Sequence, residues 1–424
     1  AVPIRRLDFL FWLWLAALLL LLLPGLDLPI RDWDEGIVAR VAYGRGQALA
    51  QFSQGELGWH ELLLPTYWAE PYLNKPPGLH LPAGLALLPW ASSGDLPPPW
   101  AVRLVPALLA SAVVPLAGLI SRQLNHKQKG AAIAAAAIAL TLLPLMRHGR
   151  LAMLDGALVS ASGLLWWQLL VSRHCRGWPL LGSGLLSGLA CSGLLLLKAP
   201  LLLPVLGIGF LLLALEQQHS RAQWLLLLVG LALGMLPGLG WHGLHYVIRG
   251  SDALLLWGAD GASRVLLSSG EGSDLGWRVP VLEVLEGGWP WLALWPFAVV
   301  LAWKQRHLSS GRWTLGLQLA MAVAVLMTGL TFVLNDVVVP GSNRFAEVTL
   351  QRALGRSLAT EKGQDIIYPR FGPRTGAVDD ASSERGLTQL FFARRFRDGE
   401  MQDVTVLDFS RVGFTQMLVA KKAV

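Results

Sequence analysis

Three acidic residues lie where a carboxylate could take part in catalysis. Asp34 and Glu35 come shortly after the first long apolar segment, and Asp155 opens a later one in the stretch RHGRLAMLDGALVSAS. A carboxylate at a membrane surface can act as a general base, or can coordinate a cation that neutralises phosphate. An ionisable group in an apolar span is costly, which makes Asp155 a candidate site residue too. The simpler explanations are solvated loop charges for the pair and a helix N-terminal acid for Asp155.

Three basic residues have a chemistry suited to binding phosphate. Lys75 precedes Pro76 and Pro77, which restrict the backbone and would present the ammonium group from a rigid turn. Lys198 ends an apolar segment, and Arg264 lies in a later polar stretch. The simpler explanation for each cation is a long side chain that reaches toward the membrane surface. For Lys198 and Arg264 this explanation is at least as good as phosphate binding.

The composition indicates a polytopic membrane protein. Of the 424 residues, 54% are hydrophobic and 15% are charged, whereas soluble domains carry about 25% charged residues. The net charge of +7 does not imply a nucleic-acid partner, because basic residues in membrane proteins set topology and meet anionic headgroups of membrane lipids. The two cysteines, Cys175 and Cys191, lack metal-type spacing. We therefore assign no cofactor and no metal ligands, and a divalent metal beside the acids stays possible.

Apolar segments divide the first 335 residues into about nine predicted spans. Basic residues precede the first span, so the chain should start on the inner side, with residues 27–100 as the first outer loop. No small-residue cleavage site follows this span, and we expect a retained anchor. Residues 78–92 are too short and proline-rich to cross and should form an interfacial helix. The predicted spans are residues 7–26, 101–121, 130–146, 156–172, 179–197, 200–215, 223–246, 289–303 and 313–333.

This topology brings all the candidate residues to the outer face. Asp34, Glu35 and Asp155 would then share that face with Lys75, Lys198 and Arg264. A base that deprotonates an acceptor, together with cations that hold a leaving phosphate, is what glycosyl transfer from a lipid phosphate requires. A lipid-linked donor would also explain why such a site lies in a membrane.

The end of the chain has a different character. Hydropathy falls from Asn335 on, and residues 336–424 are predicted to form a small soluble tail on the outer side. Residues 344–363 have helical periodicity, while QDIIYP, DVTVLDF and FTQMLVA are typical of short strands. The predicted fold is therefore an all-α polytopic helix bundle over residues 1–335 with a small α/β tail.

Four stretches together resemble a known family. They are Trp33-Asp34-Glu35, EPYLNKPPGLH, RHGRLAMLDGALV and LACSGLLLLKAPLLLP. In this order and spacing they resemble the polyprenol-phosphate-dependent glycosyltransferases of the GT-C fold. The closest groups are the 4-amino-4-deoxy-L-arabinose lipid A transferases and the dolichyl-phosphate-mannose protein mannosyltransferases. The resemblance covers about residues 5–335.

The resemblance implies a role for each matching residue. Asp34 would be the general base for the acceptor, and Asp155 would help to orient acceptor or sugar. Lys75 and Lys198 would bind near the donor phosphate. The donor would be an undecaprenyl or dolichyl phosphosugar that reacts with inversion, and the acceptor lipid A, another glycan or a protein. The implied location is the bacterial plasma (inner) membrane, with the site facing the periplasm.

Two departures from the family pattern keep other functions open. Asn74 stands where many members have an acid before the lysine, and no Lys-Leu-Pro-x-Tyr-like segment follows Trp313. An inactive scaffold that keeps the fold is therefore one alternative. A transporter or flippase of lipid-linked substrates is the other, although its charges would be expected near the middle of the bilayer.

Overall fold

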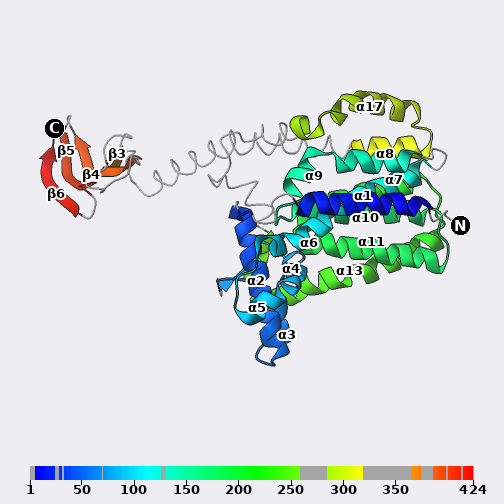
Figure 1. The fold of residues 1–424 in the computed structure, drawn as a ribbon, viewed down its shortest axis with the longest axis horizontal. Helices are drawn as coiled ribbons and strands as arrows, with labels where there is room; N and C mark the ends of the chain where they lie inside the picture. Colours follow the sequence, from blue (N-terminus) through cyan, green and yellow to red (C-terminus); the bar gives the residue numbers. More distant parts are fainter. Residues whose placement is uncertain are drawn as a thin grey trace, which may run out of the picture. The chain divides into compact units, whose positions relative to one another are not determined.

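The computed structural model describes residues 5–23, 28–30, 33–68, 70–125, 130–257, 284–318, 364–373, 385–397, 400–411 and 414–423. The chain divides into two compact units, Ala1–Val339 and Pro340–Val424 (Figure 1). The first unit is helical and contains every described candidate residue. The second is a small β-sheet, and each unit is treated by itself below.

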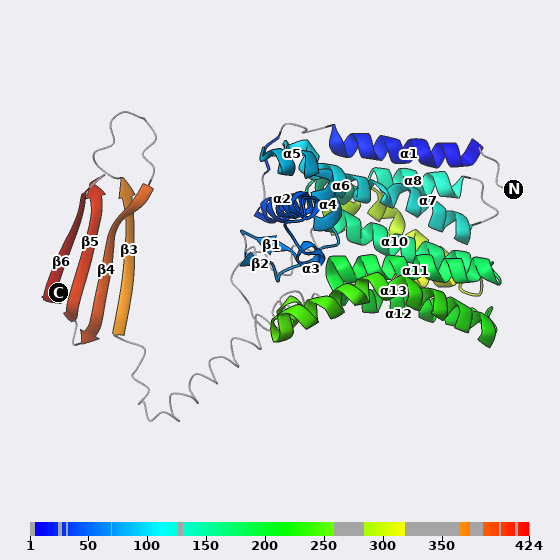
Figure 2. The same ribbon diagram turned by 90° about the horizontal axis from the view of Figure 1, so that it is seen from below.

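Long helices lie side by side in the first unit (Figures 1 and 2). These are α1 (Arg5–Leu22), α6 (Pro99–Ser111), α7 (Val113–Leu124), α8 (Ala131–Leu140), α10 (Asp155–Ser172), α11 (Trp178–Lys198), α12 (Leu202–Leu215) and α13 (Arg221–Arg249). Shorter elements are α9 (Leu143–His148), η1 (Ala199–Leu201), η2 (Gly250–Asp252), α14 (Ala253–Trp257), η4 (Trp291–Leu294) and α17 (Trp295–Lys304), with further helical residues at 284–288 and 309–318. The expected all-α bundle is confirmed.

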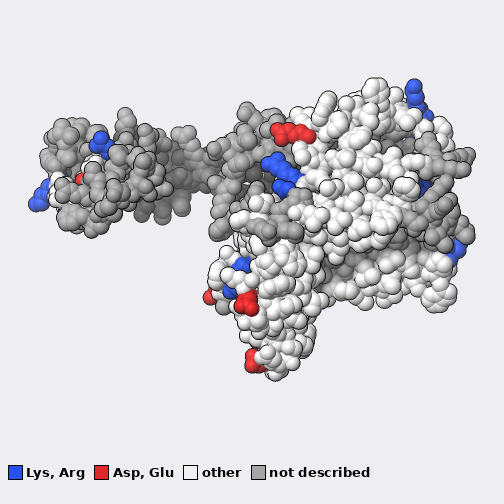
Figure 3. Space-filling view, viewed as in Figure 1, with Lys and Arg blue, Asp and Glu red and all other residues white. Residues whose placement is uncertain are grey.

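Within the described residues, three stretches are long and apolar enough to cross a membrane: Pro99–Leu124, Trp178–Leu215 and Arg221–Asp252. Shorter apolar helices cover Phe9–Leu22, Ala131–Leu140 and Trp291–Lys304. Charged side chains on the face in Figure 3 lie toward the ends of the bundle and over the layer beside it, and the surface between is uncharged. This pattern is that of helices that meet lipid along their length. The count of nine spans stays a prediction.

The stretch Trp178–Leu215 makes two passes through the bundle. Ser183 of α11 donates to the Gln168 carbonyl of α10, and Gly193 lies against Ala161, so α10 and α11 are antiparallel. Trp166 of α10 donates to the Val205 carbonyl of α12, and Gly209 lies against Trp166 and Leu169, so α10 and α12 are parallel. The chain therefore reverses between α11 and α12, where Lys198 has an extended backbone (φ −159°, ψ 87°).

Glycines allow α11 and α13 to approach closely. Gly184 and Gly188 of α11 lie against Gly230 and Gly234 of α13, backbone to backbone. Interfaces of this kind are typical of membrane helices, where small residues let backbones meet. The two helices run parallel, because Gly184 lies against Gly230 and Gly188 lies against Gly234.

Replacing Gly188 by alanine is expected to separate α11 from α13. The added methyl group would lie 2.7 Å from the Gly234 Cα, which is too close for a carbon–carbon contact. We expect a loss of stability of about 1–3 kcal/mol, the usual cost of overpacking. Thermal unfolding in detergent measures it. Gly182 of the same helix has nothing within 4 Å of such a methyl group, so Gly182→Ala is the matched control and should unfold like the wild type.

A second layer crosses one end of the bundle. It contains α2 (Trp33–Ser53), α3 (Trp59–Leu63), the strand pair β1 (Thr66–Tyr67) and β2 (Glu70–Pro71), α4 (His80–Ala86) and α5 (Leu88–Ser93). In Figure 1, α2 lies across the direction of the long helices. Buried apolar side chains, among them Val38 and Ala42 of α2 and Ala83 of α4, join this layer to the main core.

The stretch 78–92 forms two helices that are too short to cross a membrane. α4 has 7 residues and α5 has 6, whereas a spanning helix needs about 20. Gly46 of α2 lies against Ala91 of α5, and Gly84 of α4 lies against Arg45 of α2. This arrangement agrees with the expectation that the stretch does not cross.

The second unit contains a four-stranded antiparallel sheet in the order β3-β4-β5-β6. The strands are β3 (Gln364–Pro373), β4 (Arg385–Arg397), β5 (Glu400–Arg411) and β6 (Phe414–Ala423). The three predicted strands fall in β3, β5 and β6, and β4 was missed. Residues 344–363, expected to be helical, lie outside the described residues.

Candidate active site

A buried ion pair connects the helices at the end of the bundle where α2 begins. The Arg103 Nε and Nη2 atoms of α6 donate to the Glu35 Oε1 and Oε2 atoms of α2, at 2.7 and 2.9 Å. Glu35 is 0% exposed and Arg103 is 6% exposed. Two parallel hydrogen bonds from a guanidinium to a carboxylate fix direction as well as distance. The start of α2 is therefore held firmly on α6.

The same ion pair reaches two further segments. The Ala152 N–H donates to the Glu35 Oε1 atom at 2.9 Å, which holds the loop before α10. Arg103 also donates to the carbonyl oxygens of Leu28 and Pro29, at 2.8 and 3.0 Å, just after the first long helix. Three stretches that are distant in the sequence, namely residues 28–35, α6 and the loop before α10, thus converge on one buried carboxylate and one guanidinium.

This network brings two of the candidate acids to the same end of the bundle. Asp34 precedes Glu35 in the first turn of α2, and its side chain lies outside the described residues. Asp155 begins α10 three residues after Ala152, and its side chain is exposed. Because Glu35 accepts a hydrogen bond from Ala152, the two stretches are adjacent in space, as the predicted topology requires.

Glu35 itself differs from the expectation that it is a catalytic acid. Its carboxylate is fully buried and oriented by Arg103 and Ala152. A carboxylate in this environment holds other groups in place, because a general base needs access to the proton that it abstracts. We therefore propose that Glu35 positions the start of α2, which carries Asp34, and does not itself accept the proton.

Two of the candidate cations lie on segments that touch each other. Lys75 is half-buried at the start of the turn Lys75-Pro76-Pro77-Gly78. The Gly78 N–H donates to the Leu196 carbonyl in the last turn of α11 at 2.8 Å. Lys198, also half-buried, follows Leu196 by two residues at the point where the chain reverses. Arg264 lies outside the described residues.

Glycine is required at Gly78 because the turn lies directly against α11. A methyl group added there would lie 2.5 Å from the Leu196 carbonyl oxygen. The backbone of the turn that contains Lys75 is therefore in direct contact with the backbone of α11 at Gly78. This contact makes the separation between the two lysine-bearing segments small and fixed.

Two buried residues of the same layer, His80 and Arg45, were missed in the sequence analysis. His80 is fully buried, and burial lowers the pKa of its imidazole to about 4. Arg45 of α2 donates to the Leu62 carbonyl oxygen at 2.6 Å, and burial lowers its pKa to about 10. Arg103 was missed as well, although a charge in an apolar segment is a signal of function or pairing.

The described residues contain no group of three or more His, Cys, Asp or Glu side chains that could hold a metal ion. His242 and His245 of α13 share a helix face, but both rings pack on Trp241. The His242 ring bonds to the Leu195 carbonyl oxygen at 3.1 Å. His242 therefore joins α13 to α11, while His245 stacks on Trp241 of its own helix.

Known proteins resemble this chain in sequence and in fold. Residues 88–229 match the family model described as dolichyl-phosphate-mannose-protein mannosyltransferase. This stretch contains Arg103, Asp155 and Lys198, while Asp34 and Lys75 precede it. No curated protein matches the chain by sequence.

Two solved structures of ArnT from Cupriavidus metallidurans share the fold. The structure bound to undecaprenyl phosphate has a TM-score of 0.56 and 19% identity, over 75% of this chain and 55% of that chain. The apo structure has a TM-score of 0.54 and 16% identity, over 76% and 55%. The chain thus spans about half the length of these proteins. The chain therefore has the GT-C fold of these ArnT structures, and its residues 88–229 are similar in sequence to the protein mannosyltransferase family.

Proposed function

We propose that this protein is a membrane glycosyltransferase. It moves a sugar from a polyprenyl phosphate to a lipid, glycan or protein acceptor at the outer face of the bacterial plasma membrane. The observation that carries the proposal is the hydrogen bond between Glu35 and Ala152. Through it, the first turn of α2, which contains Asp34, and the loop that leads to Asp155 lie at one end of the bundle. The solved ArnT structure with undecaprenyl phosphate supports the choice of donor.

The proposed reaction is a single displacement at the anomeric carbon. Asp34 takes the proton from the acceptor hydroxyl as its oxygen attacks, and Asp155 orients the acceptor or sugar. The bond from the anomeric carbon to the phosphate oxygen breaks, and the polyprenyl phosphate leaves with the electron pair. Lys75 and Lys198, with Arg264, stabilise the charge on that phosphate. A displacement of this kind inverts the configuration of the sugar.

Radiolabelled donors test the proposal. Membranes that contain the protein are incubated with a panel of polyprenyl phosphosugars, and label is followed into lipid, glycan and protein fractions. We expect transfer from at least one pentose or hexose donor, with the product of inverted configuration. Binding of undecaprenyl phosphate without any transfer would favour an inactive scaffold. Movement of intact donor across vesicles without transfer would favour a flippase.

Lys75→Ala is expected to weaken use of the donor. Loss of a hydrogen bond to a charged group corresponds to a decrease in kcat/KM for the donor of about 10- to 100-fold. The KM for the acceptor should stay close to that of the wild type. Lys304→Ala is the matched control, because Lys304 is exposed at the end of α17. An equal loss in both variants would contradict a role for Lys75 at the phosphate.

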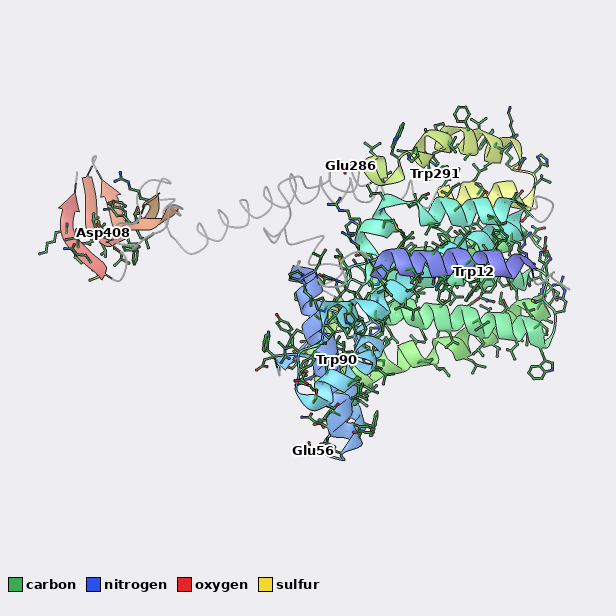
Figure 4. All side chains as sticks on the ribbon, viewed as in Figure 1. Trp12, Glu56, Trp90, Glu286, Trp291 and Asp408 are labelled. Atoms are coloured by element: carbon green, nitrogen blue, oxygen red, sulfur yellow. The ribbon has the colours of Figure 1, made fainter. Side chains whose placement is uncertain are left out.

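Cysteine labelling tests the proposed sidedness. A cysteine at Glu56, which lies at the far tip of the α2–α3 layer in Figure 4, should react with an impermeant maleimide from outside. Cys175, in the loop after α10, should react only after the membrane is permeabilised so that the maleimide reaches the inner face. Burial raises the pKa of the Cys175 thiol, so its labelling should be slow at neutral pH and become faster as the pH rises. Labelling of both positions from one side would overturn the topology.

A further inference from the structure

The turn that carries Lys75 has an unusual shortage of backbone donors. Pro76 and Pro77 have no N–H group, so neither can be held by donating a hydrogen bond. The turn is fixed instead by hydrogen bonds that residues after the two prolines donate. The Gly78 N–H donates to the Leu196 carbonyl oxygen at 2.8 Å, and the Leu81 N–H donates to the Pro77 carbonyl oxygen at 2.9 Å.

The residue next to Lys75 is held by a histidine ring. The His80 Nδ1 atom lies 3.2 Å from the Pro76 carbonyl oxygen. A carbonyl oxygen only accepts hydrogen bonds, so Nδ1 must carry the proton. In the neutral imidazole Nε2 is then an acceptor, and that atom is buried without a hydrogen-bond partner among the described residues.

The surroundings keep the ring neutral and in one orientation. His80 is 0% exposed, and the Tyr72 ring meets it edge to face at 5.6 Å between centroids. Burial, followed by the nearby positive charges of Arg45 and Lys75, keeps the pKa low at about 4. The imidazole therefore donates from Nδ1 throughout the neutral pH range.

Folding alone does not explain a histidine at this position. A buried acceptor without a partner is costly, and an apolar side chain of similar size would avoid that cost. What the histidine supplies is one directed hydrogen bond to the carbonyl group beside Lys75. The free-energy cost of the buried Nε2 atom thus falls next to the turn that carries Lys75, a residue with a proposed role at the donor phosphate.

We propose that His80 is a positioning residue: its Nδ1–H group holds the Pro76 carbonyl and so fixes the Lys75 ammonium group toward the donor phosphate. The inference rests on the proposed function of Lys75. It makes the geometry of the turn, and not only the charge of the lysine, a requirement for binding the polyprenyl phosphate. It also gives the positioning role to Nδ1 and none to Nε2, and substitutions can test the two nitrogens separately.

Three substitutions distinguish the nitrogens. In His80→Asn the amide group occupies the place of Nδ1, in His80→Gln it occupies the place of Nε2, and His80→Leu has neither. Binding of undecaprenyl phosphate to the purified full-length protein is measured along with the KM and kcat for the labelled donor. We expect His80→Gln and His80→Leu to weaken binding and raise the donor KM about tenfold, the effect of one lost hydrogen bond. His80→Asn should stay within about threefold of the wild type.

The thermal unfolding midpoint separates positioning from packing. His80→Leu should unfold close to the temperature of the wild type, because removal of the buried Nε2 atom, which has no partner, offsets loss of the hydrogen bond from Nδ1 to the Pro76 carbonyl oxygen. Wild-type affinity in both His80→Gln and His80→Leu would overturn the inference. Equal loss in all three variants together with lower unfolding temperatures would also overturn it, since the role would then be packing. If the wild type itself fails to bind undecaprenyl phosphate, the proposed donor is wrong, which is a distinct result.

Discussion

Asp34→Asn is expected to reduce sugar transfer by about 100- to 10,000-fold, the contribution of a positioned general base. Asparagine has nearly the same shape as aspartate but cannot accept the proton from the acceptor hydroxyl. The loss should appear in kcat, because Asp34 is proposed to act on the acceptor proton in the transition state. The measurement is the initial rate of label transfer at saturating donor, in membranes with equal amounts of protein.

The matched control is Glu56→Gln, which also exchanges a carboxylate for an amide. Glu56 is exposed at the tip of the layer, away from the bundle (Figure 4). It should transfer sugar at the wild-type rate. The Asp34→Asn variant should still bind undecaprenyl phosphate, because the phosphate is assigned to the cations. A rate unchanged by Asp34→Asn would remove Asp34 from the mechanism while leaving the fold assignment intact.

The general architecture could be predicted from the sequence because it follows from composition and length. Runs of apolar residues indicate spanning helices, and the short proline-rich stretch 78–92 indicates a segment that does not cross. Both are local properties. The strand β4 was missed because LTQLFFARR mixes polar and apolar residues without clear alternation, and its pairing with β3 and β5 is what determines it.

The roles within the site could be predicted only in part, because they depend on contacts between distant residues. Asp34 and Glu35 are adjacent acids of similar chemistry, and nothing in their types separates a base from a structural partner. The distinction comes from Arg103, which is 68 residues away in an apolar segment. In the same way, Lys75 and Lys198 were both identified, but the contact of Gly78 with Leu196 that joins their segments is tertiary.

The role of His80 could not be predicted from the sequence either. In the sequence it is one of several scattered histidines, and no spacing marks it out. Its importance depends on which ring nitrogen meets the Pro76 carbonyl oxygen, and on the burial that leaves the other nitrogen without a partner. Neither property can be calculated from residue types alone.

Arg103→Met is expected to destabilise the helical unit by about 3–5 kcal/mol, the usual cost of removing one partner of a buried ion pair. The Glu35 carboxylate would stay fully buried without the guanidinium that now donates two hydrogen bonds to it. Glu35→Gln should cost less. The amide oxygen can still accept from Ala152, and Arg103 keeps the carbonyl oxygens of Leu28 and Pro29.

The double variant Arg103→Met/Glu35→Gln decides whether charge or packing is responsible. It buries no charge at this position, so its thermal unfolding midpoint should lie above that of Arg103→Met alone. If the two losses simply add, the residues do not act as a pair. Sugar transfer should stay low in the double variant even where stability recovers, because the segment of Leu28 and Pro29 then lacks the guanidinium that holds it beside the start of α2. Stability and activity would thus separate, which is the behaviour expected of an ion pair that positions the catalytic segments.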